Sequence, residues 1–195
     1  MSKIVKRIVS GCLVICMLAA LSSATTVFAR MVVYGSEKAG YLVDSKQIRK
    51  KTNTYDDSAL NKKYKSYMTY GAKVWKDCGV ITLKRNCSSV NKISMYRVTD
   101  TNVNAYHWLA YQHTSSVDEE GKILRFEIKF NIEKMSNLPA ARGKSVAAHE
   151  LGHSLGLLDL YEKRNQDKLM YGIINKDNAK PTAADIKGGK YATRK

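Results

Sequence analysis

The sequence predicts an α+β domain. Two observations support this fold class. In segments near both ends of the domain, apolar residues recur every three or four positions, as in amphipathic helices. In the segments between, apolar and polar residues alternate, as in half-buried strands. No internal repeat, low-complexity block or linker interrupts this order. We therefore expect residues 30–195 to form a single domain.

The first 29 residues have the composition of a secretory signal peptide. MSKIVKR carries three positive charges, an apolar run follows, and TTVFA ends in small residues suited to cleavage after Ala29. The apolar run is shorter than the ~20 residues that a membrane-spanning helix needs, and no later run is long enough. We expect a secreted, extracellular protein of 195 − 29 = 166 residues, a length that suits one domain.

The mature chain is strongly basic. Removing residues 1–29 takes away three of the 33 Lys and Arg and none of the 17 Asp and Glu, which leaves a net charge of 30 − 17 = +13. Such a charge attracts anionic polymers, including those of cell walls. The lysines are scattered and no compact recognition motif is present, so we expect no specific nucleic-acid binding. We also expect the protein to be a monomer.

Two cysteines remain after loss of the signal peptide, Cys78 and Cys87. Outside the cell, an even pair is interpreted first as a disulfide. Closing so short a loop stabilises a fold by about 2–3 kcal/mol. A metal-binding or inhibitory thiol is the lesser alternative.

The mature chain is expected to begin with a short strand. Residues 30–55 are mostly polar, and the one segment with strand character lies around Tyr41–Val43. Alternatively, part of residues 30–55 is a small pro-segment that is removed on maturation. The sequence leaves both possibilities open.

Residues 56–79 predict the first helix. Asp57 or Ser58 is suited to cap its start, and Gly79 lies just beyond its end. The apolar side chains recur at three and four positions and form one face, which we expect to be part of the core: Leu60, Tyr64, Tyr67, Met68, Gly71 and Trp75.

Strands are expected after this helix, where the hydrophobic period changes to two. The candidate segments are residues 80–83, 92–98, 104–112 and 123–133, of which residues 104–112 can also be an irregular loop. The last segment, ILRFEIKFNIE, alternates most regularly. Its predicted buried face consists of Leu124, Phe126, Ile128, Phe130 and Ile132.

Two further helices complete the expected order of elements. The first follows Pro139 and should end at Gly156, and the second starts at Pro181 and Thr182 and should stop at Gly188-Gly189. Residues 157–180 between them predict a loop.

The first of these helices contains a candidate metal site. His149 and His153 are four residues apart, so both imidazoles lie on one face and can bind one metal ion. The Glu150 carboxylate then lies beside the metal, where it can accept a proton from a water. Catalytic zinc normally takes three protein ligands. Because Gly156 allows the chain to turn back, Asp159 can supply the third, and we expect one Zn²⁺.

Two alternatives bear on this interpretation. The five-residue pattern HExxH is short enough to occur by chance, and two histidines four apart can lie on a solvated helix face. The longer pattern HExxHxxGxxD is more demanding, and the neighbouring residues Val146, Ala147, Ala148, Leu151 and Leu155 are apolar. For Asp159, the alternative role is capping a turn.

The segment VAAHELGHSLGL resembles the zinc-binding helix of metzincin metallopeptidases, and of matrixins in particular. KLMYG resembles the methionine turn of that family, and PTAADIKGGKYA is similar to the closing matrixin helix. The resemblance implies a zincin-like catalytic domain with a twisted mixed β-sheet, an active-site helix, a Met-turn and a C-terminal helix. It also implies that Met170 packs beneath the zinc without chemical action.

This sequence departs from the matrixin pattern at the third ligand. Matrixins have a histidine where this chain has Asp159, and an aspartate there resembles snapalysin, a small secreted bacterial metzincin. Metzincins with a tyrosine ligand place it two residues after the methionine, whereas Tyr171 follows Met170 directly, so we do not assign Tyr171 to zinc.

These patterns predict a secreted zinc endopeptidase that acts on proteins or peptides, with Glu150 as general base. By resemblance, the substrate lies extended along an edge strand, for which residues 104–112 are the candidate, and residues 171–180 form the wall of the pocket for the side chain after the cut. The alternative is a non-proteolytic, basic binding module of the same fold that docks to anionic cell-surface polymers. Glu150 argues against it, because a structural site does not need a base.

Overall fold

The computed structural model describes residues 34–97 and 108–194, so the predicted signal peptide and residues 104–107 lie outside the described part of the chain. Within the described ranges the fold is α+β, as predicted. None of the helices in these ranges is long and apolar enough to cross a membrane.

The elements follow the expected order, with additional strands near the start. The strands are β1 (Tyr34–Ser36), β2 (Tyr41–Val43), β3 (Thr52–Tyr55), β4 (Thr82–Arg85), β5 (Lys92–Tyr96), β6 (Ala110–Val117) and β7 (Ile123–Asn131). The helices are α2 (Lys62–Asp77), α3 (Ile132–Ser136), α4 (Ala140–Leu155) and α5 (Ala183–Ala192), with a 3₁₀ turn, η3, at Lys163–Asn165.

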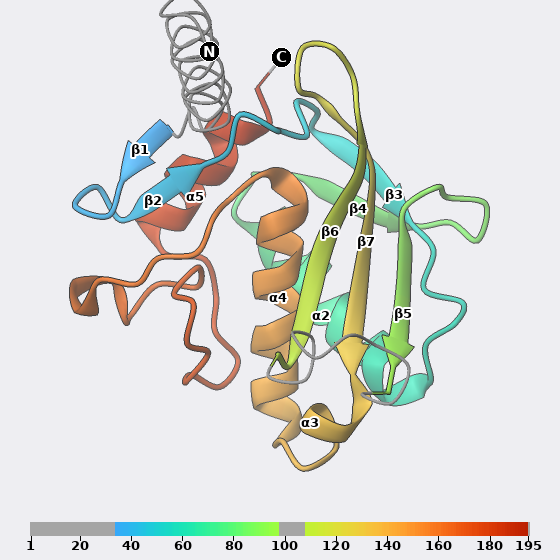
Figure 1. Ribbon diagram of the computed structural model, residues 1–195. Coiled ribbons are helices and arrows are strands. Elements are labelled where there is room, and N and C mark those ends of the chain that lie inside the picture. The colour runs from blue at the N-terminus through green and yellow to red at the C-terminus, as the bar shows by residue number, and fades with distance from the viewer. Residues whose placement is uncertain (1–33, 98–107, 195) are drawn as a thin grey trace, which may run out of the picture. The chain divides into compact units, whose positions relative to one another are not determined.

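Five of the strands form a mixed sheet. β3 pairs with β4 in parallel, and β7 lies between β5, which is parallel to it, and β6, which is antiparallel. A backbone bridge between Asp56 and Lys92 joins β3 to β5. The resulting order is β4-β3-β5-β7-β6. Among the described strands β6 pairs only with β7, which makes β6 an edge strand (Figure 1).

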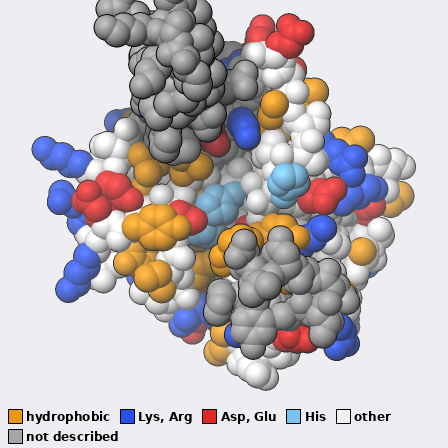
Figure 2. All heavy atoms as spheres, viewed as in Figure 1, with side chains coloured by type: hydrophobic (Ala, Val, Ile, Leu, Met, Phe, Trp, Pro, Cys, Tyr) orange, Lys and Arg blue, Asp and Glu red, His pale blue; other side chains and the backbone are white. Residues whose placement is uncertain are grey.

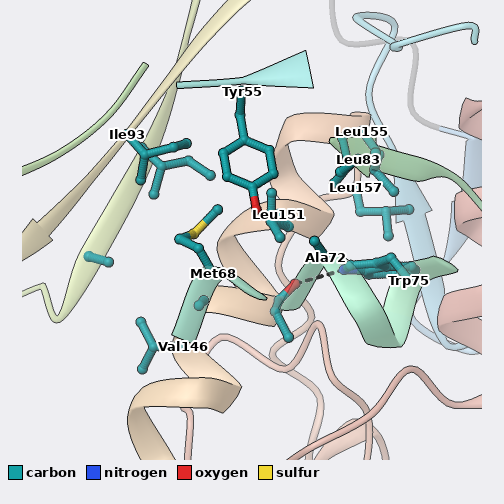
Figure 3. Packing of buried hydrophobic residues seen from close by; sticks show 14 of the residues in the cluster. Tyr55, Met68, Ala72, Trp75, Leu83, Ile93, Val146, Leu151, Leu155 and Leu157 are labelled. Atoms are coloured by element: carbon teal, nitrogen blue, oxygen red, sulfur yellow. Dashed lines mark hydrogen bonds between the residues drawn. The ribbon is translucent and has the colours of Figure 1, made fainter. Parts of the chain in front are cut away.

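The two long helices α2 and α4 pack against each other and share the core with the sheet. The apolar face predicted for the first helix is buried. In Figure 3, Trp75 of α2 reaches α4, where its indole N–H donates a hydrogen bond of 2.8 Å to the Ala148 carbonyl oxygen. At Gly71 an added Cβ would lie 3.0 Å from the Ala148 backbone nitrogen, so the helices are too close for a side chain there. α2 therefore fixes the helix that carries His149.

The start of α2 differs from the prediction. Its N-cap is Asn61, whose side chain accepts the Tyr64 N–H at 3.2 Å. Asp57 instead accepts a hydrogen bond of 2.6 Å from the Arg85 guanidinium, and the Ser58 N–H donates to the side chain of Asp56. Both residues proposed as caps thus belong to the connection between β3 and α2. The end agrees: Gly79, with φ of +69°, follows the last turn.

The predicted alternation in residues 123–133 holds for Phe126, Ile128 and Phe130, which are buried, but Leu124 is exposed. The pairing of β6 with β7 skips Ser115 on one strand and Leu124 on the other, and such irregularities turn a residue out of the alternating pattern. β7 also ends earlier than expected. The Asn131 side chain accepts hydrogen bonds from the N–H groups of Glu133 and Lys134 and so caps the start of α3. Ile132 therefore lies in a helix.

The prediction that Gly188-Gly189 stops the last helix is wrong, because α5 continues to Ala192. Both glycines are buried. A Cβ at Gly188 would lie 2.9 Å from Leu157, and one at Gly189 would lie 2.8 Å from Val80. These glycines therefore allow α5 to pack closely on the core and do not end it.

The predicted disulfide is absent. Cys78 and Cys87 are both free, one at the end of α2 and the other beyond β4. The four residues of β4 lie between them, and an extended strand of that length spans about 13 Å. Disulfide-bonded Cα atoms lie about 4.4–6.8 Å apart, so the intervening strand keeps the two thiols from meeting.

Residues before α2 are more structured than expected. The strand predicted at Tyr41–Val43 is present as β2, and it pairs with β1 in a hairpin that packs on α5 (Figure 1). The chain then passes the end of α4, where the Ile48 N–H donates to the Leu155 carbonyl oxygen, and enters the sheet as β3. The N-terminal hairpin thus lies next to the end of the helix that carries the candidate metal site.

Candidate metal centre

The end of α4 determines where the candidate ligands lie. His149 and His153 occupy successive turns of this helix. Gly156 ends it with φ of +106°, and an added Cβ would lie 2.3 Å from the Lys46 carbonyl oxygen, so both conformation and space require glycine. Past Gly156 the chain turns back along the helix and places Asp159 opposite the two histidines.

The three predicted ligands converge. The Nε2 atoms of His149 and His153 are 3.0 Å apart, and Oδ1 of Asp159 lies 3.1 Å from the first and 3.5 Å from the second. Among the His, Cys, Asp and Glu side chains of the described residues, these three have ligand atoms close enough together to hold one metal ion. The sequence spacing thus led to a set of residues that the fold brings together.

Hydrogen bonds fix the orientation of both imidazoles. Nδ1 of His149 lies 2.8 Å from the Leu169 carbonyl oxygen, and Nδ1 of His153 lies 2.8 Å from that of Leu157. A carbonyl oxygen can only accept, so each Nδ1 carries the hydrogen. Each Nε2 is then left with a lone pair directed at the centre of the group, the arrangement that metal-binding histidines commonly show.

The donor set fits a cation such as Zn²⁺. With neutral imidazoles, three acceptor atoms face one another, and the buried Oδ1 of Asp159 has no hydrogen-bond donor. A metal ion satisfies all three, and two imidazoles with one carboxylate form a recognised catalytic zinc set. Without a metal, one imidazole binds a second proton. Burial lowers the pKa of His153, but the hydrogen bond to Asp159 and the charges of Glu150 and Asp159 raise it to about 9.

Asp159 is held as a carboxylate. Burial raises its pKa, but hydrogen bonds and charge from His149 and His153 outweigh this effect and hold the pKa of Asp159 far below its usual range. Its second oxygen, Oδ2, accepts a hydrogen bond of 3.2 Å from the Tyr161 hydroxyl. Oδ1 thus faces the two histidines, while Oδ2 is fixed by a tyrosine that the sequence reasoning did not single out.

Glu150 is a buried carboxyl group beside the ligands. It is 5% exposed, and its Oε2 atom has no hydrogen-bond partner among the described residues. Burial raises the pKa of Glu150, while the charges of His153 and His149 act in the opposite direction. An unpartnered buried carboxyl oxygen next to a metal group is positioned to exchange a proton with a water at that site.

Comparisons with known proteins do not identify the chain. No protein-family model matches it, and a search of curated proteins also finds no match. Membership of the metzincins therefore stays a prediction from the motif.

Figure 2 shows histidine side chains at the surface in the middle of one face, with acidic and hydrophobic side chains beside them.

Met170 lies beneath the helix between the two histidines. A Cβ added at Gly152 would lie 2.3 Å from the Met170 sulfur, so glycine is what allows this contact. The turn itself is held by the fully buried carboxylate of Asp185, which accepts the N–H groups of Leu169 at 3.0 Å and Met170 at 3.2 Å. Since the Leu169 carbonyl oxygen binds His149, Asp185 supports a ligand indirectly.

Sequence reasoning missed Asp185, although a pattern for it was present. Thr182 and Asp185 form a capping box at the start of α5, in which the threonine hydroxyl and the carboxylate exchange backbone hydrogen bonds. The spacing T-x-x-D is a known start pattern for a helix. What the spacing does not reveal is that the same carboxylate also binds the turn at Met170.

A small hollow lies between α4 and the loop around the methionine turn. Its lining is partly apolar, from Tyr171, Ile173 and Ile174, and partly polar, from Ser145, Lys168, Asn175 and Lys176. Several of these residues lie within 171–180, and the role of that segment as the wall of a substrate pocket stays a prediction. Tyr171 lies in the lining of the hollow, and the metal group does not include it.

Proposed function

We propose that this chain is a secreted, zinc-dependent endopeptidase. One observation carries the proposal: Nε2 of His149, Nε2 of His153 and Oδ1 of Asp159 converge closely enough to hold one metal ion, beside Glu150, whose carboxyl oxygen Oε2 has no hydrogen-bond partner among the described residues. Three protein ligands leave a position for water, which distinguishes a catalytic zinc site from a closed structural one.

Each group at the site has a separate role in peptide hydrolysis. When bound, Zn²⁺ polarises the scissile carbonyl group and makes a water at the site more acidic. Glu150 accepts a proton from the attacking water and delivers it to the departing amine. The Oε2 atom of Glu150 has no hydrogen-bond partner among the described residues, so it is free to take part in this exchange. Met170 supports the helix and takes no part in the chemistry.

The edge strand and the hollow supply a route for the substrate. β6 packs on α4 and, among the described strands, pairs only with β7, so its outer side can bind an extended peptide by backbone hydrogen bonds. The hollow between α4 and residues 168–179 is our candidate for the pocket that accepts the side chain that follows the cut.

A casein cleavage assay tests the proposal. We expect the purified protein to cleave casein, and we expect a zinc chelator to abolish the activity. Glu150→Gln keeps the shape of the side chain but removes the base, so its rate should fall by about 10²–10⁴-fold while zinc stays bound. Glu119→Gln, at an exposed position between β6 and β7, makes the same chemical change and should cleave like the original chain.

Chelator-resistant cleavage, or an active Glu150→Gln variant, would contradict the assignment. The second candidate function is the non-proteolytic basic module, which the net charge of the mature chain, 30 − 17 = +13, favours. That function predicts no cleavage in any sample, together with binding to anionic polymers that weakens as salt is added and does not change with chelator.

A further inference from the structure

The backbone that carries Asp159 is held on both sides. Before Asp159, the Leu158 N–H donates a hydrogen bond of 3.0 Å to the Leu42 carbonyl oxygen of β2. After it, the Leu160 N–H donates a hydrogen bond of 2.9 Å to the Met170 carbonyl oxygen. The third candidate ligand thus lies between the N-terminal hairpin and the methionine turn.

A carboxylate from the hairpin binds the loop just beyond this point. Glu37, in the turn between β1 and β2, accepts the Tyr161 N–H on Oε1 at 2.7 Å and the Glu162 N–H on Oε2 at 3.3 Å. The side-chain amide of the buried Asn165 donates to both the carboxylate and the backbone carbonyl oxygen of Glu37. One acidic side chain therefore collects three donors from a segment more than 120 positions away in the sequence.

Tyr161 connects these hydrogen bonds of Glu37 to the metal group. Its hydroxyl donates to Oδ2 of Asp159 at 3.2 Å, yet the residue is 67% exposed, so burial does little to hold the ring. The ring passes over Gly172, where an added Cβ would lie 2.6 Å from it. The position of the hydroxyl thus depends on the Tyr161 backbone, which Glu37 fixes.

We propose that Glu37 is a positioning residue of the metal centre. Its carboxylate fixes Tyr161, whose hydroxyl holds the Asp159 carboxylate with Oδ1 towards the two histidines. This inference rests on the proposed zinc site and adds the N-terminal hairpin to it.

The test is the Zn²⁺ affinity of the full chain, measured by competition with a chelating dye. Loss of a residue that orients a ligand typically lowers metal affinity about 10–100-fold, and we expect a loss in this range for Glu37→Gln. Glu162→Gln makes the same charge change in the same loop. Among the described residues its carboxylate pairs with Arg164 on the surface, and this variant should bind zinc like the original chain.

A second variant guards against a simple loss of stability. Tyr161→Phe removes only the hydroxyl from an exposed ring, and because Glu37 acts through that hydroxyl, it should weaken zinc binding at least as much as Glu37→Gln does. Because the two residues act in series, the double variant should bind no more weakly than Tyr161→Phe alone. The visible spectrum of the Co²⁺-loaded protein should change in both variants, since it reports the ligand geometry, and stay unchanged in Glu162→Gln.

The outcomes separate this inference from the proposed function. Unchanged zinc affinity and an unchanged Co²⁺ spectrum in Glu37→Gln and Tyr161→Phe overturn the role of Glu37, whether or not the protein cleaves casein. A Glu37-dependent affinity in a protein that cleaves nothing supports that role and overturns only the proteolytic assignment. Failure of the original chain to bind zinc overturns both.

Discussion

At the scale of single residues, Asp56 shows how one carboxylate stabilises the join between two parts of the sheet. It accepts a hydrogen bond of 2.9 Å from Lys92 and another from the Ser58 N–H, at the bridge that connects β3 with β5. The hydrogen bond from Lys92, followed by those from Ser58, lowers the pKa of Asp56 from 3.8 to about 2.

This lowered pKa predicts a pH-dependent contribution to stability. The folded state binds the Asp56 proton more weakly than the unfolded state, so the stabilisation is present above pH 3.8 and is lost as the pH falls towards 2. Urea unfolding of Asp56→Asn should therefore show a deficit at neutral pH that shrinks below about pH 4. A deficit of the same size at every pH would contradict the assignment, and Lys92→Met should reproduce the pattern.

The site residues could be predicted only where local spacing decides them. His149, Glu150 and His153 follow from one helical turn, and Asp159 follows from the turn that Gly156 permits. Two of the groups that orient them, Glu37 and Asp185, come from distant segments, and Tyr161, two residues after Asp159, lies in a loop without hydrophobic period. No spacing rule connects those segments to the motif, so the sequence could not place them.

At the scale of elements, the two glycines that follow α2 and α4 form a matched pair. Both have positive φ, +69° at Gly79 and +106° at Gly156. Space is open around Gly79, whereas at Gly156 a Cβ would meet the Lys46 backbone. Alanine at Gly79 therefore bears only the cost of a left-handed conformation, about 1–2 kcal/mol.

Gly156→Ala should be more destabilising than Gly79→Ala. A backbone clash adds about 1–3 kcal/mol to the conformational cost, and it displaces the turn that leads to Asp159. We expect the free energy of unfolding, measured with urea, to fall further for Gly156→Ala, and zinc affinity to fall for that variant alone. Equal losses of stability in the two variants would show that the close approach at Lys46 does not constrain the turn.

Elements were predictable where the hydrophobic period was long and regular. The buried face of α2 and the central part of β7 follow from that period, and the end of α4 follows from Gly156. β3 was missed because TNTY is short and polar, and its pairing with β4 and the bridge to β5 that follows it come from tertiary contacts. Leu124 was misplaced because a bulge interrupts the alternation, and a bulge leaves no mark in the hydrophobic pattern.

At the scale of the whole molecule, the candidate centre joins segments from both ends of the described chain. The β1–β2 hairpin binds the loop after Asp159 through Glu37, and α5 binds the methionine turn through Asp185. The helix α4 provides two ligands and the base, while the hairpin and α5 hold the loop that follows the third ligand and the methionine turn. Composition and spacing predicted the class of fold but not this long-range connection.

The central claim is that His149, His153 and Asp159 together hold one zinc ion, and metal content tests it most directly. After dialysis at neutral pH, elemental analysis should find one zinc per chain in the original protein and in Glu150→Gln, and a marked loss in Asp159→Ala. An original protein without zinc, or an Asp159→Ala variant that retains it fully, would contradict the account.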